Sequence, residues 1–312
     1  MLDNIEQTIE CISRAVKGKR TAAEMALTCL IAQGHMLIED IPGVGKTTMV
    51  KALARSLGLG FNRIQFTPDV LPSDVTGVDI YNQTEKKFVY MKGPVFTNIL
   101  LADEINRATP KTQSSLLEVM EERQVTVDGA VYKLPYPFMV MATQNPIDFE
   151  GTFVLPESQL DRFMMKISMG YPQRSSEKEM LDDYLEGNPL DEIVPVLSAD
   201  EVKNMIEDAK DVFMAPEIKE YILDIGEATR TCEYVSYGVS PRGLLLLARA
   251  AKAFAYMEGR DYCIPDDVKK LAPYVLPHRI IIKSVKFNRG DAKSITDEII
   301  RGVRVPRGEA YV

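Results

Sequence analysis

Short apolar runs alternate with amphipathic segments over residues 1–172 of the chain. Three of the runs have the length of buried central strands, namely His35–Ile38, Ile99–Ala102 and Phe138–Ala142. The segments between them carry apolar residues at helical spacing. Because strands that alternate with helices form parallel sheets, this order predicts an α/β fold with a largely parallel sheet.

Two of the predicted helices have recognisable ends. One covers Lys46–Leu57 and stops before Gly58, a residue suited to the left-handed turn that ends many helices. The other begins after Thr109, whose hydroxyl can cap a helix, with Pro110 at the first helical position. Local chemistry therefore predicts where both helices lie.

Two hairpins are predicted within this alternation. The first has strands at 78–81 and 87–91 around a polar tip, Asn82 to Lys86. The second has strands at 124–127 and 131–134 around Asp128-Gly129, a pair typical of two-residue hairpin turns. We expect both hairpins to be inserted between the core strands rather than to replace them.

The pattern changes after Tyr171-Pro172, where only helical spacing is found. Ser198 with Glu201 three residues later predicts a capping box. Further helices are expected to start at Pro216, at Ser240-Pro241 and at Pro265, and Pro273 should end or kink the last of these. The tail from Arg289 is mixed and charged, so we expect an edge element or a loosely held segment. The predicted domains are an α/β domain at 1–172 and a helical domain with its tail at 173–312.

Composition narrows the classes of function. A length of 312 residues fits about two domains. The net charge of −8 and the isoelectric point near 5.1 argue against a surface built mainly to neutralise nucleic-acid phosphates. A local basic groove stays compatible with these values.

The cysteines do not follow a metal-binding or disulfide pattern. Cys11, Cys29, Cys232 and Cys263 are widely spaced, and the chain has two histidines. We expect buried reduced thiols. The N-terminus lacks a secretory signal pattern and no apolar stretch approaches 18 residues, so no membrane span is expected. A cytoplasmic location fits these features.

A glycine-bearing loop between the first strand and the first helix predicts a phosphate site. Gly43 and Gly45 let successive backbone N–H groups face phosphate oxygens, at the positive end of a helix. Lys46 can reach the β- and γ-phosphates, and the Thr47 hydroxyl can join a Mg²⁺ shell. Asp40 stands where the usual motif has its first glycine. The predicted nucleotide-binding residues are Asp40, Pro42, Gly43, Val44, Gly45, Lys46, Thr47 and Thr48.

The strand at 99–102 delivers two carboxylates at its end, Asp103 and Glu104. Open α/β sheets place ligands at the carboxyl ends of their strands. Asp103 can hold Mg²⁺ through water, and Glu104 can polarise the attacking water as general base. We therefore predict an ATP-hydrolysing site with Thr47 and Asp103 as metal ligands.

The chain resembles the MoxR family of AAA+ ATPases from about residue 16 to about residue 285. The stretches that carry the resemblance are EDIPGVGKT (39–47), RIQFTPDVLPSDVTG (63–77), GPVFTNILLADEINRA (93–108), MATQNPIDFEGTFVLPESQLDRF (141–163) and SPRGLLLLARAAKAFA (240–255). The resemblance implies a P-loop AAA+ core with a five-stranded parallel sheet between helices and two hairpin insertions, followed by an all-α lid.

The resemblance also implies roles for several polar residues. Asn145 takes the first sensor position, and Arg162 is similar to the arginine finger that reaches a neighbouring subunit's nucleotide. Arg242 resembles the second sensor, acting on its own subunit's nucleotide or on a neighbour's. Arg107 serves either a subunit interface or a structural ion pair. The hairpin aromatics either grip a client or pack the hairpins onto the core, and they are Phe88, Tyr90 and Tyr132.

The function implied is that of a ring-forming chaperone-like ATPase, a homo-oligomer taken as a hexamer. It would remodel or mature a protein client, in some cases with a von Willebrand factor A domain protein, or assist metal or cofactor insertion. The alternatives are a nucleic-acid motor or loader, the ATPase subunit of a metal chelatase, and a non-hydrolysing scaffold. The acidic charge argues against the motor, and the presence of Lys46, Asp103, Glu104 and Asn145 argues against the scaffold.

Overall fold

A five-stranded parallel sheet lies at the centre of the chain. The computed structural model describes residues 2–306 except 85, 147–150, 188 and 284–290. The strand order is β2-β5-β8-β1-β9, and every neighbouring pair is parallel. The strands are β1 (Met36–Glu39), β2 (Phe61–Gln65), β5 (Ile99–Asp103), β8 (Met139–Gln144) and β9 (Met165–Ile167). The α/β prediction is confirmed, and β1, β5 and β8 are the three predicted strands.

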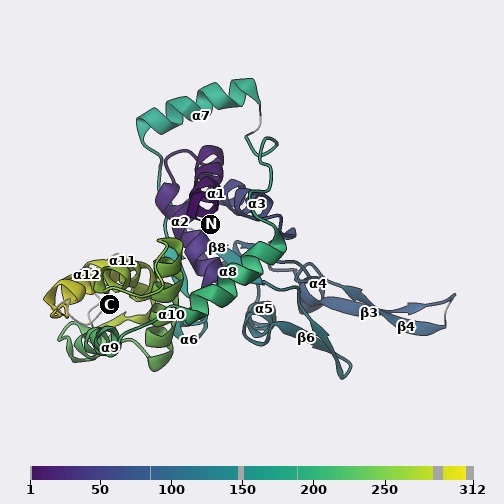
Figure 1. Ribbon diagram of the computed structural model, residues 1–312. Coiled ribbons are helices and arrows are strands. Elements are labelled where there is room, and N and C mark those ends of the chain that lie inside the picture. Colours follow the sequence, from purple (N-terminus) through teal and green to yellow (C-terminus); the bar gives the residue numbers. More distant parts are fainter. Residues whose placement is uncertain (1, 85, 147–150, 188, 284–290, 307–312) are drawn as a thin grey trace.

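Helices cover both faces of this sheet (Figure 1). Met36 and Ile38 of β1 face a core shared with the helices of one face, whereas Leu37 faces the core of the other. The first face is covered by α1 (Leu2–Ala15), α2 (Arg20–Ile31) and α3 (Lys46–Ser56). The second is covered by α4 (Pro72–Thr76), the 3₁₀ turn η1 (Ile105–Arg107) and α5 (Pro110–Glu122). Burial on both faces explains why β5 and β8 are apolar runs without alternation.

The two predicted hairpins are confirmed and project away from the sheet (Figure 1). They are β3 (Gly77–Asn82) with β4 (Lys87–Lys92), and β6 (Gln124–Val127) with β7 (Ala130–Lys133). Asp128 and Gly129 have φ values of 47° and 82°, as a two-residue turn requires. Tyr90 and Tyr132 pack one hairpin on the other, with ring centroids 4.3 Å apart, whereas Phe88 is 70% exposed.

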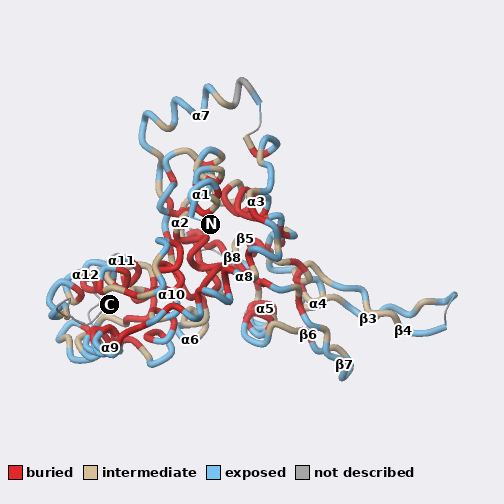
Figure 2. The backbone as a smooth tube through the Cα atoms, viewed as in Figure 1, coloured by how far each residue is buried: buried red, intermediate tan, exposed pale blue. Residues whose placement is uncertain are grey.

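A helical region follows the sheet and packs back against it. Its helices are α6 (Glu157–Leu160), α7 (Arg174–Glu186), α8 (Ala199–Asp211), α9 (Pro216–Thr231), α10 (Pro241–Met257), α11 (Pro265–Val275), η2 (Pro277–Arg279) and α12 (Asp291–Gly302). The capping box at Ser198 and Glu201 and the cap at Ser240 are both formed, as predicted. Figure 2 shows one buried layer running from the sheet to α10. The boundary at residue 172 stays a prediction.

Two features of this region differ from the expectation. Strands β10 (Val235–Tyr237) and β11 (Ile281–Ile282) form a small antiparallel pair within a region expected to be all helical. They are too short for alternation to show. The expected edge element or loose tail contains helix α12, with Ile295 and Ile300 buried. The start of that tail at Arg289 lies outside the described residues.

The cysteines are free thiols, with Cys29 and Cys263 buried and Cys11 and Cys232 half-buried. Burial raises the pKa of Cys263 to about 12 and that of Cys29 still further. Within the described residues, His, Cys, Asp and Glu side chains form no cluster that could hold a metal ion. No helix among these residues is long and apolar enough to cross a membrane.

Candidate functional site

The predicted phosphate loop connects the end of β1 to the start of α3. Gly43 and Gly45 have φ values of 85° and 91°, in the left-handed region that favours glycine. Gly45 is also the N-cap of α3, so the helix begins at Lys46. Val44 between the glycines is buried and anchors the loop in the core, whereas Pro42 and Gly43 are exposed. The loop therefore offers its backbone at a helix N-terminus, where N–H groups bind anions.

Lys46 lies among carboxylates at this end of the sheet. Its Nζ donates a hydrogen bond of 2.7 Å to the backbone oxygen of Asp40. Burial lowers the pKa of Lys46, and the charges of Asp40, Asp103 and Glu104 oppose that shift. Thr47 and Thr48 follow in the first turn of α3 and are half-buried. The loop and the carboxylate pair thus converge, as predicted.

Both oxygens of the Asp40 carboxylate accept hydrogen bonds within this chain, which argues against direct contact with a nucleotide, and its role as a nucleotide-binding residue stays a prediction. One oxygen accepts a hydrogen bond from its neighbour Ile41 N at 2.9 Å. The other accepts bonds from Met169 N and Gly170 N, both at 2.6 Å, and from Ser168 Oγ at 3.2 Å. An anion would also repel a phosphate. Asp40 instead fastens the phosphate loop to the segment after β9.

The Asp103 carboxylate lies at the end of β5 and is nearly buried. One oxygen accepts from Thr143 Oγ1 at 2.5 Å, and the other from Arg63 Nη2 at 2.7 Å. Thr143 also accepts a bond from the backbone N of Glu104. Sequence reasoning missed Arg63 and Thr143, although both stand in stretches that carry the family resemblance. Arg63 lies on β2, a strand that was not predicted, and Thr143 lies on β8 just past the predicted run. The position of each residue on a strand beside β5 is the signal that could have identified them.

Glu104 is held in place by backbone and side-chain contacts. Its φ is 57°, an uncommon left-handed value for a residue other than glycine. Its carboxylate accepts bonds from Gln65 Nε2 at 2.9 Å and from Arg107 Nη1 at 3.1 Å. Arg107 therefore makes an ion pair within the chain, one of the two predicted alternatives.

Asn145 follows directly after β8 and is buried. Strand β8 pairs with β5 on one side and with β1 on the other, so the predicted neighbourhood of Asn145 and Asp103 is confirmed. The phosphate loop, the carboxylate pair and Asn145 therefore stand at the carboxyl ends of three adjacent parallel strands. Open α/β sheets bind ligands at this edge.

Arg162 and Arg242 lie at the opposite side of the sheet, at the amino ends of its strands, which we call the amino edge. Helix α5 runs back from the site for 13 residues, about 20 Å. Its end reaches the start of β1, where Arg123 donates to Gln33 O at 2.9 Å. Arg242 pairs with Glu121 near this end, at 2.5 Å. Arg162 lines a pocket of about 280 Å³ together with Glu118, Glu121 and Glu122 of α5. Two residues after Arg162, Met164 N donates a hydrogen bond to His35 O, just before β1 begins. Neither arginine is therefore brought to the phosphate loop of its own chain.

The residues at the carboxyl edge suit a divalent cation. Thr47 offers a hydroxyl oxygen and Asp103 a carboxylate oxygen, the donor type that Mg²⁺ prefers. The bonds from Arg63 and Thr143 already occupy Asp103, which favours contact through water rather than direct ligation. Such an ion would neutralise charge on the phosphates.

Comparisons with known proteins agree with this geometry. Residues 35–165 match the ATPase family associated with various cellular activities (AAA), and residues 227–299 match the AAA lid domain. The uncharacterized protein YeaC of Bacillus subtilis is 50% identical over 301 residues, covering 96% of this chain and 94% of YeaC. Chaperone MoxR1 of Mycobacterium tuberculosis is 42% identical over 287 residues, covering 89% of this chain and 76% of MoxR1.

A crystal structure of a candidate ATPase from Cytophaga hutchinsonii is similar over nearly the whole chain. It has a TM-score of 0.89 and 38% sequence identity, and the match covers 98% of this chain and 96% of that one. The core and the lid are therefore arranged alike in both proteins. Relatives over most of the length, together with a matched ATPase core and lid, lead to one conclusion: this ATP-hydrolysing chain belongs to the MoxR family of AAA+ ATPases.

Proposed function

We propose that this chain is the subunit of a homo-oligomeric ring, taken as a hexamer, that uses ATP hydrolysis to remodel or mature a protein client or to assist metal or cofactor insertion. One observation carries the ring: the predicted catalytic residues are divided between opposite edges of one sheet. A chain whose Arg162 and Arg242 cannot reach its own phosphate loop needs a second copy to complete the site. The chaperone role rests on similarity to Chaperone MoxR1.

The residues at the carboxyl edge supply the chemistry of the first half-site. Lys46 and the backbone of Gly43 to Thr48 bind the phosphates, with Mg²⁺ held by Thr47 and Asp103. Glu104 takes a proton from the attacking water, and Asn145 positions that water beside the γ-phosphate. The new bond joins the water oxygen to the γ-phosphorus while the bond to the β–γ bridging oxygen breaks, which yields ADP and phosphate.

The residues at the amino edge supply the second half-site to a neighbouring chain. Arg162 stabilises the charge on the transferring phosphoryl group, a contribution of about 10³–10⁵ in rate where such arginines have been studied. Arg242 lies beside Glu121 at the same edge, so it also serves the neighbour's nucleotide. Of the two alternatives that the sequence leaves open for Arg242, the contact with Glu121 supports action on the neighbour's nucleotide.

The client and the von Willebrand factor A partner belong to the same proposal. The hairpin β3–β4 projects from the sheet and is largely exposed (Figure 2). Its exposed apolar residues include Val78, Ile80, Phe88 and Met91. Exposed apolar side chains on a projecting element are typical of interaction surfaces. Among the predicted client-gripping aromatics, Phe88 is available to a client, whereas Tyr90 and Tyr132 pack on each other.

The variant Glu104→Gln tests the catalytic assignment. It should abolish steady-state phosphate release while a fluorescent ATP analogue still binds, because the amide cannot take a proton from water. Glu217→Gln, on the exposed face of α9, is the matched control and should leave both readouts unchanged. Unchanged turnover in Glu104→Gln would remove Glu104 from the base role.

Mixed assemblies test the division of the site between chains. Arg162→Ala alone and Glu104→Gln alone should each be inactive. Mixing them should restore turnover, since an intact Glu104 on the first chain then meets an intact Arg162 on the second. A mixture no more active than its components would show that the site is not shared.

A further inference from the structure

Arg279 is a buried charged residue that packs against the segment carrying Arg162. It ends the 3₁₀ turn η2 after α11, and its side chain is 1% exposed. Burial lowers the pKa of Arg279 to about 10, so the guanidinium is still charged at neutral pH. A buried charge persists only where its donors are satisfied.

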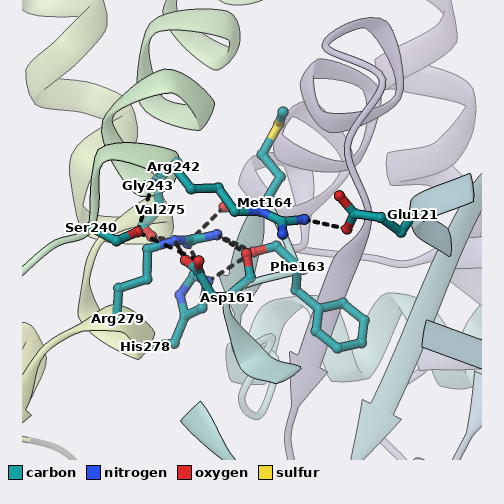
Figure 3. Close-up of polar contacts among 10 residues, drawn as sticks. All are labelled: Glu121, Asp161, Phe163, Met164, Ser240, Arg242, Gly243, Val275, His278 and Arg279. Carbon is teal, nitrogen blue, oxygen red and sulfur yellow. Dashed lines mark hydrogen bonds and ion pairs between the residues drawn. The ribbon is translucent and has the colours of Figure 1, made fainter. Parts of the chain in front are cut away.

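The Arg279 guanidinium binds the backbone on both sides of Arg162 (Figure 3). Its Nη2 donates to Asp161 O at 2.9 Å and to Phe163 O at 2.6 Å. Its Nη1 donates to Met164 O at 3.3 Å and to Val275 O within its own helical segment. The residues before and after Arg162 are therefore held by one rigid, planar group.

The Asp161 carboxylate extends this contact to the helix that carries Arg242. One of its oxygens accepts from Arg279 Nε at 2.7 Å, and the other lies 3.5 Å from Ser240 Oγ (Figure 3). Ser240 is the N-cap of α10, and Arg242 lies in the first turn of that helix. The segments of both arginines thus meet at one carboxylate.

The Arg279 side chain packs closely against the first turn of α10. A Cβ added at Gly243, in the first turn of α10, would meet Arg279 Cδ at 2.7 Å and Val239 Cγ1 at 2.6 Å. His278 adds a contact of 3.0 Å from its Nε2 to Phe163 O. Close packing of Gly243 on Arg279 thus joins α10 to η2, and η2 in turn contacts the 161–164 segment.

We propose that Arg279 is a positioning residue that holds Arg162 and Arg242 together as one unit facing the neighbouring chain's nucleotide. This rests on the proposed sharing of the site between chains. Arg279 itself does not contact the nucleotide. It sets the direction of Arg162, and it makes the lid and the arginine finger move as one body.

The expected effect follows from geometry. A displacement of about 1 Å in a catalytic group lowers the rate by about 10²-fold. Lysine at position 279 keeps the charge but offers a single ammonium in place of the planar fork, so it cannot bind Asp161 and Phe163 at once. We expect Arg279→Lys to lower kcat by about 10- to 100-fold, with KM for ATP and binding of a fluorescent ATP analogue unchanged.

The deciding experiment uses mixed assemblies of the full-length chain. Arg279→Lys is mixed with Glu104→Gln, and turnover is measured across the mixing ratio. The Arg279→Lys chain has an intact phosphate loop, and its Glu104→Gln neighbour supplies a correctly held Arg162, so the mixture should regain turnover above either component. Arg260→Lys is the matched control, since Arg260 makes a partly buried two-contact pair with Asp267 in the lid, away from Arg162. It should keep wild-type kcat.

Each outcome decides the proposal. Unchanged kcat in Arg279→Lys overturns the proposal. The proposal is also overturned if the mixture of Arg279→Lys with Glu104→Gln does not regain turnover while the mixture of Arg162→Ala with Glu104→Gln does. Failure of both mixtures overturns the shared site itself, and the positioning role with it. If Arg279→Lys does not fold, Asp161→Asn is put through the same series, because it weakens the same contact with little change of shape. Recovery of that variant supports the proposal and its absence overturns it.

Discussion

The contact between Asp40 and the segment after β9 makes a quantitative prediction. Asp40→Ala removes an acceptor that serves Met169 N and Gly170 N, both at 2.6 Å, and Ser168 Oγ. Asp40→Asn keeps the shape, but its NH₂ group faces a backbone donor whichever way the amide is turned. Asp40→Ala therefore removes both acceptor oxygens, whereas Asp40→Asn keeps one of them.

The magnitude follows from the number of bonds. A hydrogen bond to a charged group contributes about 1.5–3 kcal/mol net. Met169 is buried, whereas Gly170 is half-buried and its N–H regains some water. We therefore expect Asp40→Ala to lower the free energy of unfolding by about 3–4 kcal/mol and Asp40→Asn by about 2 kcal/mol. Either value is a large part of the 5–15 kcal/mol typical of a domain.

Urea denaturation followed by circular dichroism measures these values, and titration with a fluorescent ATP analogue measures the second consequence. Because Asp40 begins the phosphate loop, both variants should bind nucleotide more weakly, in the same order. Asp266→Asn is the control, since this exposed carboxylate pairs with Lys269 on one helix and should contribute less than about 0.5 kcal/mol. Values for both Asp40 variants as small as that of the control would refute the reasoning.

Two further predictions concern other buried polar groups. Burial lowers the pKa of His35 to about 4, against about 6.5 in the unfolded chain, so the unfolded state alone takes up the proton between these values. Stability should therefore fall as the pH drops from about 6.5 to about 4, by on the order of 3 kcal/mol from this group. We expect urea denaturation of His35→Gln across this range to give a free energy of unfolding that depends less steeply on pH, by the equivalent of about one proton. An unchanged dependence on pH would contradict the assignment of this proton to His35. Asp267→Ala should lower the free energy of unfolding by about 3–5 kcal/mol in thermal melts, because it leaves the Arg260 charge without its partner in the lid. Asp200→Ala, at an exposed ion pair, should lower the free energy of unfolding far less, and an equal loss would count against the role of burial.

The elements that the sequence predicted well are those determined by local chemistry. Thr109, Ser198 and Ser240 cap helices where the sequence placed them, since a cap needs only its own first turn. Strand β2 was missed because it lies at the sheet edge, where its side chains are largely half-buried or exposed. Helix α12 was missed although its buried residues, Ala292, Ile295, Thr296 and Ile300, stand at helical spacing.

The site divides in the same way. The phosphate loop and the pair of Asp103 and Glu104 could be predicted because each follows a recognisable strand. The bonds from Arg63 to Asp103 and from Asp40 to the 168–170 segment join residues 40 and about 130 positions apart. Such contacts depend on which strands become neighbours, and single-sequence patterns do not contain that information.

Lys46 and Arg162 lie at opposite ends of the parallel strands, so each chain has two different contact surfaces, one with the phosphate loop and one with the arginine. A two-fold dimer presents one patch to its own copy, so it cannot join two opposite edges in a single contact. Head-to-tail association can, and when it closes it has rotational symmetry about one axis with every chain oriented alike. A damaged Arg162 in one chain would then silence the nucleotide of one neighbour and spare that of the other. Any coupling between sites in such an assembly would run one way around the axis.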